Sequence, residues 1–149
     1  MHAKDAELAA ALTEQLSDEK IVAAAYARVD TALSPARMLS PLGNYLIARP
    51  AARAAAKKMT EQTDIPLDAA VVFGISDDAL HVWAADPMLN RVGEHLGQIP
   101  LERITSIKVE GGKSWQPVTI SMADGKSVEL EGRGSIHAVA AEFDKRKAG

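Results

Sequence analysis

Cysteine is absent from this 149-residue sequence, and aromatic residues make up only 4% of it. Without thiols the chain can form neither disulfide bonds nor thiolate metal sites, which is compatible with a reducing cytoplasm. No apolar run approaches the roughly 20 residues of a membrane-spanning helix, and the acidic residues within positions 1–16 argue against a signal peptide. We therefore expect a cytoplasmic protein with a single main domain.

Motifs of catalysis and of metal binding are also lacking. No H-E-x-x-H pattern is present, and no G-x-S-x-G elbow supports a triad of Ser76, His81 and Asp86. His81 falls within a predicted strand, and we interpret it as an exposed or hydrogen-bonded side chain rather than a ligand. The Gly111-Gly112-Lys113 segment lacks the spacing of a phosphate-binding loop and is interpreted as a turn. We expect neither an enzyme nor a bound cofactor or metal.

What the sequence contains, from Asp68 onward, is a series of short alternating apolar segments separated by turn residues. This pattern is typical of antiparallel strands. A turn at Asp77-Asp78 places Phe73 opposite Val82, so that the apolar residues of both strands share one face. The predicted strands of this region span residues 69–75, 80–85, 93–99, 104–110, 117–122 and 127–131.

The last predicted hairpin offers a choice of loop length. A two-residue Asp-Gly turn would set Ile120 opposite Glu129 and place a carboxylate on the core face. A three-residue loop with Gly125 in the left-handed conformation pairs Ile120 with Val128 instead. We therefore predict the longer loop.

Helical spacing replaces strand alternation near the C-terminus. Ile136, Val139 and Phe143 fall on one helical face, which predicts an amphipathic helix with one buried side. Gly132 and Gly134 would let the chain turn sharply from the last strand into this helix.

The first thirty residues contain one clear element and one ambiguous one. Residues 5–16 carry Leu8, Leu12 and Leu16 in line, which predicts a helix. Residues 20–29 fit either a helix or a strand, because their apolar residues have helical spacing and alanine favours helices. We favour a strand, since it would complete the sheet.

The net charge of −3 conceals a basic segment. Pro50 is a favourable first helical residue, and three bases recur every four positions around it, which predicts a basic helical stripe. The stripe is either a solvated helix face or a surface for acidic lipid headgroups, an acidic protein or nucleic acid. The pI of about 5.8 makes nucleic acid the least favoured of these. Residues 31–60 contain no acid and five bases, namely Arg37, Arg49, Arg53, Lys57 and Lys58.

Trp83 alternates out of the face formed by Leu80 and Val82 in its predicted strand. An outward tryptophan beside His81 would mark a partner interface. The alternative is that Trp83 packs beneath the long loop or the N-terminal helix. Trp83 therefore joins the five bases as a candidate partner-binding residue.

The complete set of predicted elements resembles the pleckstrin-homology-like (PH-like) fold, an α+β half-barrel of seven antiparallel strands with a C-terminal capping helix. The segment Ile99–Val109, IPLERITSIKV, is similar to a strand entry of bacterial PH-like and GRAM-like domains. The resemblance covers most of residues 20–147 and implies a PH-like domain at 19–149. Residues 1–18 would form an N-terminal helical extension, and residues 31–66 a long, partly helical insertion between the first two strands.

The resemblance implies a non-enzymatic binding or scaffold module. Some relatives bind phosphoinositides or peptides through the loop between the first two strands, which is where the basic segment falls here. We expect recruitment to a protein partner or to an anionic membrane surface, with peripheral attachment at the inner membrane face in the second case. The alternative is a small-ligand-binding or enzymatic domain with a pocket between the long loop and the barrel.

Overall fold

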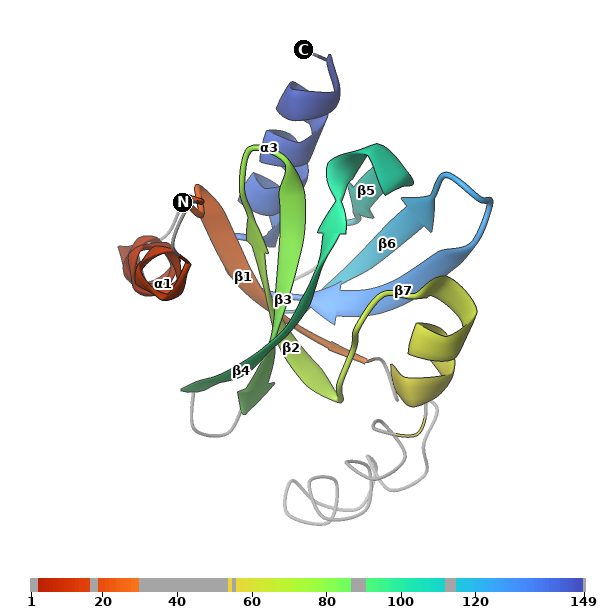
Figure 1. Cartoon of the computed structure of the whole chain (residues 1–149), viewed down its shortest axis with the longest axis horizontal. Helices are drawn as coiled ribbons and strands as arrows, with labels where there is room; N and C mark the ends of the chain where they lie inside the picture. Colours follow the sequence, from red (N-terminus) through yellow and green to blue (C-terminus); the bar gives the residue numbers. More distant parts are fainter. Residues whose placement is uncertain are drawn as a thin grey trace.

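The alternating segments form one antiparallel sheet in the computed structural model, which describes residues 3–16, 19–29, 54, 56–86, 91–111 and 115–148. The order across the sheet is β4-β3-β2-β1-β7-β6-β5, so β4 and β5 are its two edges. The sheet curls, with β2 to β4 on one side and β5 to β7 on the other (Figure 1). The strands are β1 (Ala23–Val29), β2 (Ala70–Ile75), β3 (Ala79–Asp86), β4 (Arg91–Pro100), β5 (Ile104–Val109), β6 (Gln116–Met122) and β7 (Ser127–Gly132). The predicted strands are thus confirmed, with small differences at their ends.

Both predicted hairpin registers are confirmed. Phe73 lies opposite Val82 in the pairing of β2 with β3, and Ile120 lies opposite Val128 in the pairing of β6 with β7. Gly125 has a φ of 91° and donates its N–H to the Met122 carbonyl at 3.0 Å, as the three-residue loop requires. The loop choice that kept a carboxylate off the core face was therefore correct.

β1 settles the ambiguity of residues 20–29 in favour of a strand. It lies in the middle of the sheet, where Ala25 pairs with Phe73 of β2 and Ala27 pairs with Gly132 of β7. Its residues are buried on both faces of the sheet, including Ala24 on one side and Ala25 on the other. A strand covered on both sides does not need to alternate apolar with polar residues, which explains the misleading pattern.

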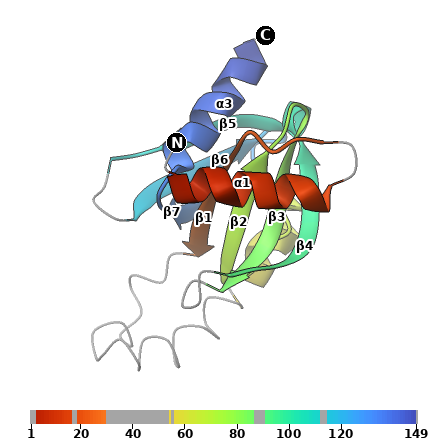
Figure 2. The ribbon, with the colours of Figure 1, turned by 90° about the vertical axis from the view of Figure 1, so that its left-hand side faces the viewer.

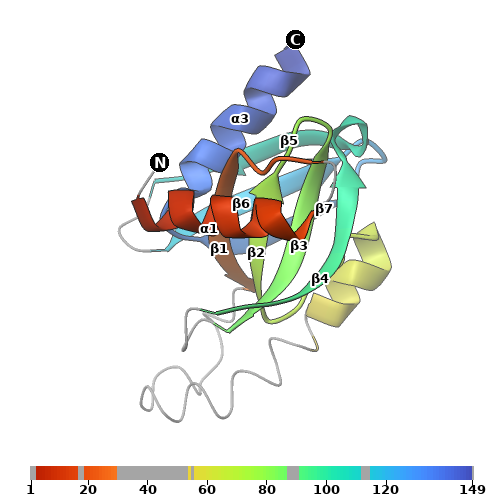
Figure 3. The same ribbon diagram turned by 60° about the vertical axis from the view of Figure 1, so that its left-hand side comes forward.

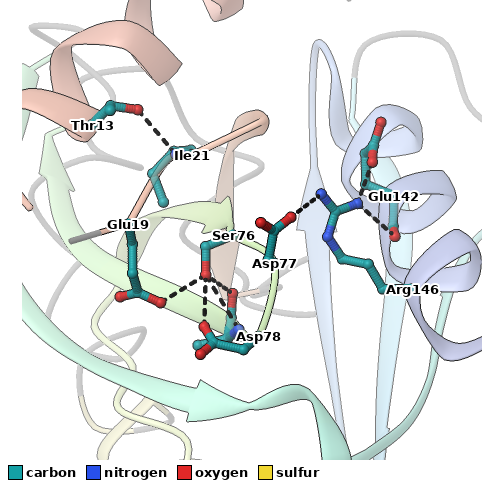
Figure 4. A network of polar contacts seen from close by, with 9 residues as sticks. Thr13, Glu19, Ile21, Ser76, Asp77, Asp78, Glu142 and Arg146 are labelled. Carbon is teal, nitrogen blue, oxygen red and sulfur yellow. Dashed lines mark hydrogen bonds and ion pairs between the residues drawn. The ribbon is translucent and has the colours of Figure 1, made fainter. Parts of the chain in front are cut away.

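The main core fills the inner face of the curled sheet. The C-terminal helix α3 (Ile136–Ala148) packs against β1, β2 and β5, and its predicted apolar face is buried in this core. The short helix η2 (Leu101–Arg103) joins β4 to β5 and buries Leu101. Near the C-terminal end of α3, Arg146 Nη2 donates to Asp77 Oδ1 of the β2–β3 turn at 2.9 Å (Figure 4). The helix predicted from the 3.6-residue period is therefore confirmed.

Part of the predicted helical insertion is visible. Residues 56–63 are helical, and Ala56 and Ile65 are both fully buried against the inner core. The remainder of the predicted insertion, residues 31–53, lies outside the described residues.

The N-terminal helix α1 (Ala3–Gln15) forms a separate layer on the outside of the sheet. It crosses β1, β2 and β3, as Figures 2 and 3 show. Ala9 and Leu12 are buried there in a second apolar cluster with Val72 and Trp83. Within the described part of the chain, no helix combines the length and the apolar character of a membrane span.

Gly132 is required for space rather than for an unusual backbone angle. A Cβ atom at this position would lie 2.5 Å from Ile136 Cγ1, whereas the sharp turn is made by Gly134, with a φ of 62°. We expect Gly132→Ala to lower the free energy of unfolding by about 1–3 kcal/mol, the usual cost of overpacking. Urea denaturation would measure the change. Gly111→Ala is the matched control, because a Cβ there meets nothing within 4 Å, and equal losses in both variants would contradict the clash.

Candidate functional site

The predicted basic residues are only partly visible. Arg37, Arg49 and Arg53 lie outside the described residues. Lys57 and Lys58 are exposed on the helix at residues 56–63. Because the opposite side of this helix is anchored in the core, the two lysines are held at a fixed place on the surface.

Acidic residues follow these lysines closely. Glu61 is exposed on the next turn of the same helix, and Asp64 follows at the helix end. Arg103 Nη2 lies 3.8 Å from Asp64 Oδ2, but both side chains are well exposed, so this ion pair contributes little to stability. The described surface around Lys57 and Lys58 is therefore a mixture of both charge signs.

Trp83 is not a surface residue, and its prediction as an exposed partner contact is wrong. Its side chain is fully buried beneath α1, where Nε1 donates to Gln15 Oε1 at 3.2 Å. Strand alternation correctly placed Trp83 on the face opposite Val82. That face is covered by α1 instead of by water, so the alternative, packing beneath the N-terminal helix, is confirmed.

Next to Trp83, three side chains from different parts of the chain form a polar series, hereafter the Glu19-His81-His95 chain. His81 is 1% exposed, and its Nδ1 lies 2.9 Å from Nε2 of His95 on β4. Its Nε2 lies 2.8 Å from Oε2 of Glu19, which belongs to the connection between α1 and β1. Of the two readings of His81, exposed or hydrogen-bonded, the second is confirmed.

The second oxygen of Glu19 is also engaged. Ser76 Oγ donates to Glu19 Oε1 at 3.0 Å, and Asp78 Oδ1 lies 3.3 Å from the same hydroxyl (Figure 4). These contacts lower the pKa of Asp78, chiefly through hydrogen bonding with the Glu19 carboxyl. Ser76 thus binds Glu19 rather than His81, and the arrangement is not a serine triad.

The hydrogen-bonding capacity of each group determines which ring nitrogens of His81 and His95 carry protons at neutral pH. A carboxylate only accepts hydrogen bonds, so the His81 proton belongs on Nε2, facing Glu19. The 2.8 Å approach of His81 Nε2 to Glu19 Oε2 is a close polar contact that does not meet the geometry of a hydrogen bond. His81 Nδ1 is then free to accept the N–H of His95 Nε2.

Aromatic contacts flank the two imidazoles, of which His81 is buried and His95 is exposed. The Trp83 ring stacks on His81 at 5.6 Å between ring centroids and meets His95 edge-on at 5.0 Å. Desolvation by partial burial lowers the pKa of His95 from its ordinary value of 6.5, and the nearby His81 lowers it further, against an opposing effect of Glu19. The surroundings of His95 therefore favour its neutral form.

A second cluster lies around Trp115. The Arg28 guanidinium carbon is 3.9 Å from the Trp115 ring centroid, and that of Arg133 is 5.2 Å away. Arg28 also pairs with Glu131 at 3.2 Å, while Arg133 lies over the Tyr26 ring at 4.9 Å. These cation–π contacts join β1, β7 and the start of β6, and sequence reasoning missed them because no local spacing signals them.

No protein-family model and no curated protein sequence matches this chain. Among the described residues, no three side chains of the types histidine, aspartate and glutamate converge as a metal site would require. The candidate regions are therefore the exposed lysine pair and the partly buried Glu19-His81-His95 chain. The first can bind an anionic group, and the second can hold and share a proton.

Proposed function

We propose that this protein is a non-enzymatic PH-like binding module, which engages an acidic protein partner through the basic segment at residues 31–60. The supporting observation is the exposed pair Lys57 and Lys58, fixed on a helix whose other side is anchored in the core. This pair ends a stretch of the sequence that has five bases and no acid. A helix that is already anchored is favourable for binding, because less backbone freedom is lost when the partner arrives.

The PH-like assignment is supported by the order of the elements. Seven antiparallel strands curl around one core, and a C-terminal helix follows the last strand. The segment between β1 and β2 contains the basic residues, as in PH-like domains that bind through this loop. The curled sheet would then be a rigid support for the binding segment, consistent with function residing in a loop on a stable scaffold.

An acidic protein fits the described surface better than a uniformly anionic membrane does. Glu61 and Asp64 border the two lysines, and a membrane of acidic lipids would repel them. A polypeptide, unlike a flat membrane, can place its acidic side chains against the two lysines and away from Glu61 and Asp64. Recruitment to an anionic membrane remains a second candidate, favoured only by the absence of acids from residues 31–60.

The test uses poly-glutamate as an acidic polypeptide probe and vesicles that contain phosphatidylserine as the membrane probe. We expect the chain to bind poly-glutamate at low salt and to lose binding as salt screens the charges. The double variant Lys57→Glu/Lys58→Glu should bind at least roughly thirtyfold more weakly, since each base near an anionic surface contributes on the order of 1 kcal/mol and a factor of ten corresponds to about 1.4 kcal/mol. Fluorescence anisotropy of labelled poly-glutamate would measure the affinities.

The matched control is Lys108→Glu/Lys126→Glu, which changes the net charge equally at two exposed lysines of the β5–β7 half. This control should keep most of the binding. Equal losses in both double variants, or no binding of poly-glutamate by the wild type, would contradict the proposal. Stronger binding to the vesicles than to poly-glutamate would favour the membrane candidate instead.

A further inference from the structure

The Glu19-His81-His95 chain links the connection that follows α1 to two neighbouring strands of the sheet. Glu19 belongs to the connection that follows α1, His81 to β3, and His95 to the edge strand β4. The same connection is fixed to α1, because the Ile21 N–H donates to Thr13 Oγ1 at 2.9 Å (Figure 4). A change in the histidine contacts would therefore reach both α1 and β4.

The pair of histidines can accept one extra proton without breaking apart. A first proton can bind His95 at Nδ1, and its Nε2–H still donates to His81. A second proton would have to bind His81 Nδ1, which is the acceptor of that same hydrogen bond. Two N–H groups would then face each other at the present 2.9 Å separation, on two positively charged rings.

The groups around the pair come from three sides. Glu19 and Asp78 are the acidic side chains, on the α1–β1 connection and on the β2–β3 turn, and both interact with the histidines. The groups on the α1 side and within the sheet, Gln15 and Trp83, are neutral. Because the pKa of Asp78 is lowered from 3.8, this carboxyl stays ionised throughout the range in which histidines titrate.

We propose that the Glu19-His81-His95 chain is a pH-sensitive latch, which holds α1 on the outer face of the sheet at neutral pH and releases it in mild acid. The inference is independent of the binding function proposed above. When the latch opens, the buried His81 imidazole becomes hydrated, and His95 no longer faces it and can take up a proton. Release uncovers Trp83 and the apolar residues that share its cluster beneath α1.

The direction of the pH effect follows from proton counting. The pKa of His95 is lower in the closed form than its ordinary 6.5, so the open form binds more protons below that pH. The closed form is thus progressively disfavoured as the pH falls. Each additional proton in the open form changes the closed-to-open ratio by up to about tenfold per pH unit.

Hydrogen exchange of the full chain, followed by mass spectrometry between pH 7.5 and 5.0 and corrected for intrinsic exchange rates, tests the latch. We expect the protection of α1 amides to fall by up to about tenfold per pH unit below about pH 6.5. Amides of β5, β6 and β7 should keep their protection. In a Trp115→Phe background, which leaves Trp83 as the single tryptophan, the emission should shift to longer wavelength over the same pH range.

The decisive variant is His95→Gln, because a glutamine amide can donate to His81 but does not titrate. This variant should retain α1 protection at pH 5.5 and show a shallower pH dependence. His137→Gln, at an exposed histidine of α3, should behave like the wild type. The proposal would be overturned if the protection of α1 did not depend on pH, or if the two variants behaved alike. It would also be overturned if the whole sheet opened together with α1.

Discussion

Replacing Phe143 by alanine is expected to lower the free energy of unfolding by about 3–5 kcal/mol, the usual cost of truncating a buried phenylalanine. Phe143 is 1% exposed and lies in the inner core on α3. The cavity would open between α3 and the strands that this helix covers. Since small domains are stable by only about 5–15 kcal/mol, the change would remove a large fraction of the total stability. Urea denaturation followed by circular dichroism would measure it.

Asp144→Ala provides the control on the same helix, because Asp144 is exposed and is the next residue along the chain. Its effect should stay within about 0.5 kcal/mol, as for most surface substitutions. A loss for Phe143→Ala no larger than that of Asp144→Ala would show that α3 does not fill the core as described.

Trp83→Ala is expected to lower the free energy of unfolding as much as Phe143→Ala does. Its main effect should fall on the packing of α1 against the outer face of the sheet. The substitution removes a fully buried ring, its hydrogen bond to Gln15 and its contacts with both histidines. The expected loss is about 3–5 kcal/mol, accompanied by a loss of α1 protection in hydrogen exchange. Trp83 thus acts as the main apolar contact between α1 and the sheet.

The other tryptophan supplies the comparison. Trp115 is only partly buried and is held by the guanidinium groups of Arg28 and Arg133. Trp115→Ala should therefore cost about 1 kcal/mol, the scale of an exposed cation–π contact, and should leave α1 protected. Equal protection of the α1 amides in the Trp83→Ala and Trp115→Ala variants would contradict the packing of α1 on the sheet.

The sheet could be predicted from the sequence because its signals are local. Alternation within each strand and the turn chemistry at Gly125 determine the hairpin registers without any knowledge of distant residues. β1 was harder to assign, because its alanines are covered on both faces and show no strand alternation. Its assignment as a strand depended on the need to complete the sheet.

The outer layer shows where local patterns stop being informative. Alternation correctly placed Trp83 and Val82 on different faces of the sheet. A strand pattern does not show, however, whether the second face is covered by water or by a helix. The aligned residues Leu8, Leu12 and Leu16 were the available signal, since an apolar helix stripe must be covered by something. Matching that stripe to Trp83 would have predicted the second apolar cluster.

The polar contacts could not be predicted in the same way. Glu19 meets His81 across elements that are distant in sequence, and no spacing rule connects them. His95 is nearer in sequence, but the pairing of β3 with β4 shifts register around Trp83, so simple strand counting misplaces it. Such contacts depend on tertiary geometry, which only the folded chain supplies.

The most direct test of the Glu19-His81-His95 chain is a long-range proton–nitrogen NMR spectrum of the imidazole rings at pH 7.5. We predict that His81 carries a proton on Nε2 in a single arrangement, and that its Nδ1 is coupled through a hydrogen bond to Nε2 of His95. A mixture of tautomers in rapid exchange with water, as expected for the exposed His137, would contradict the arrangement.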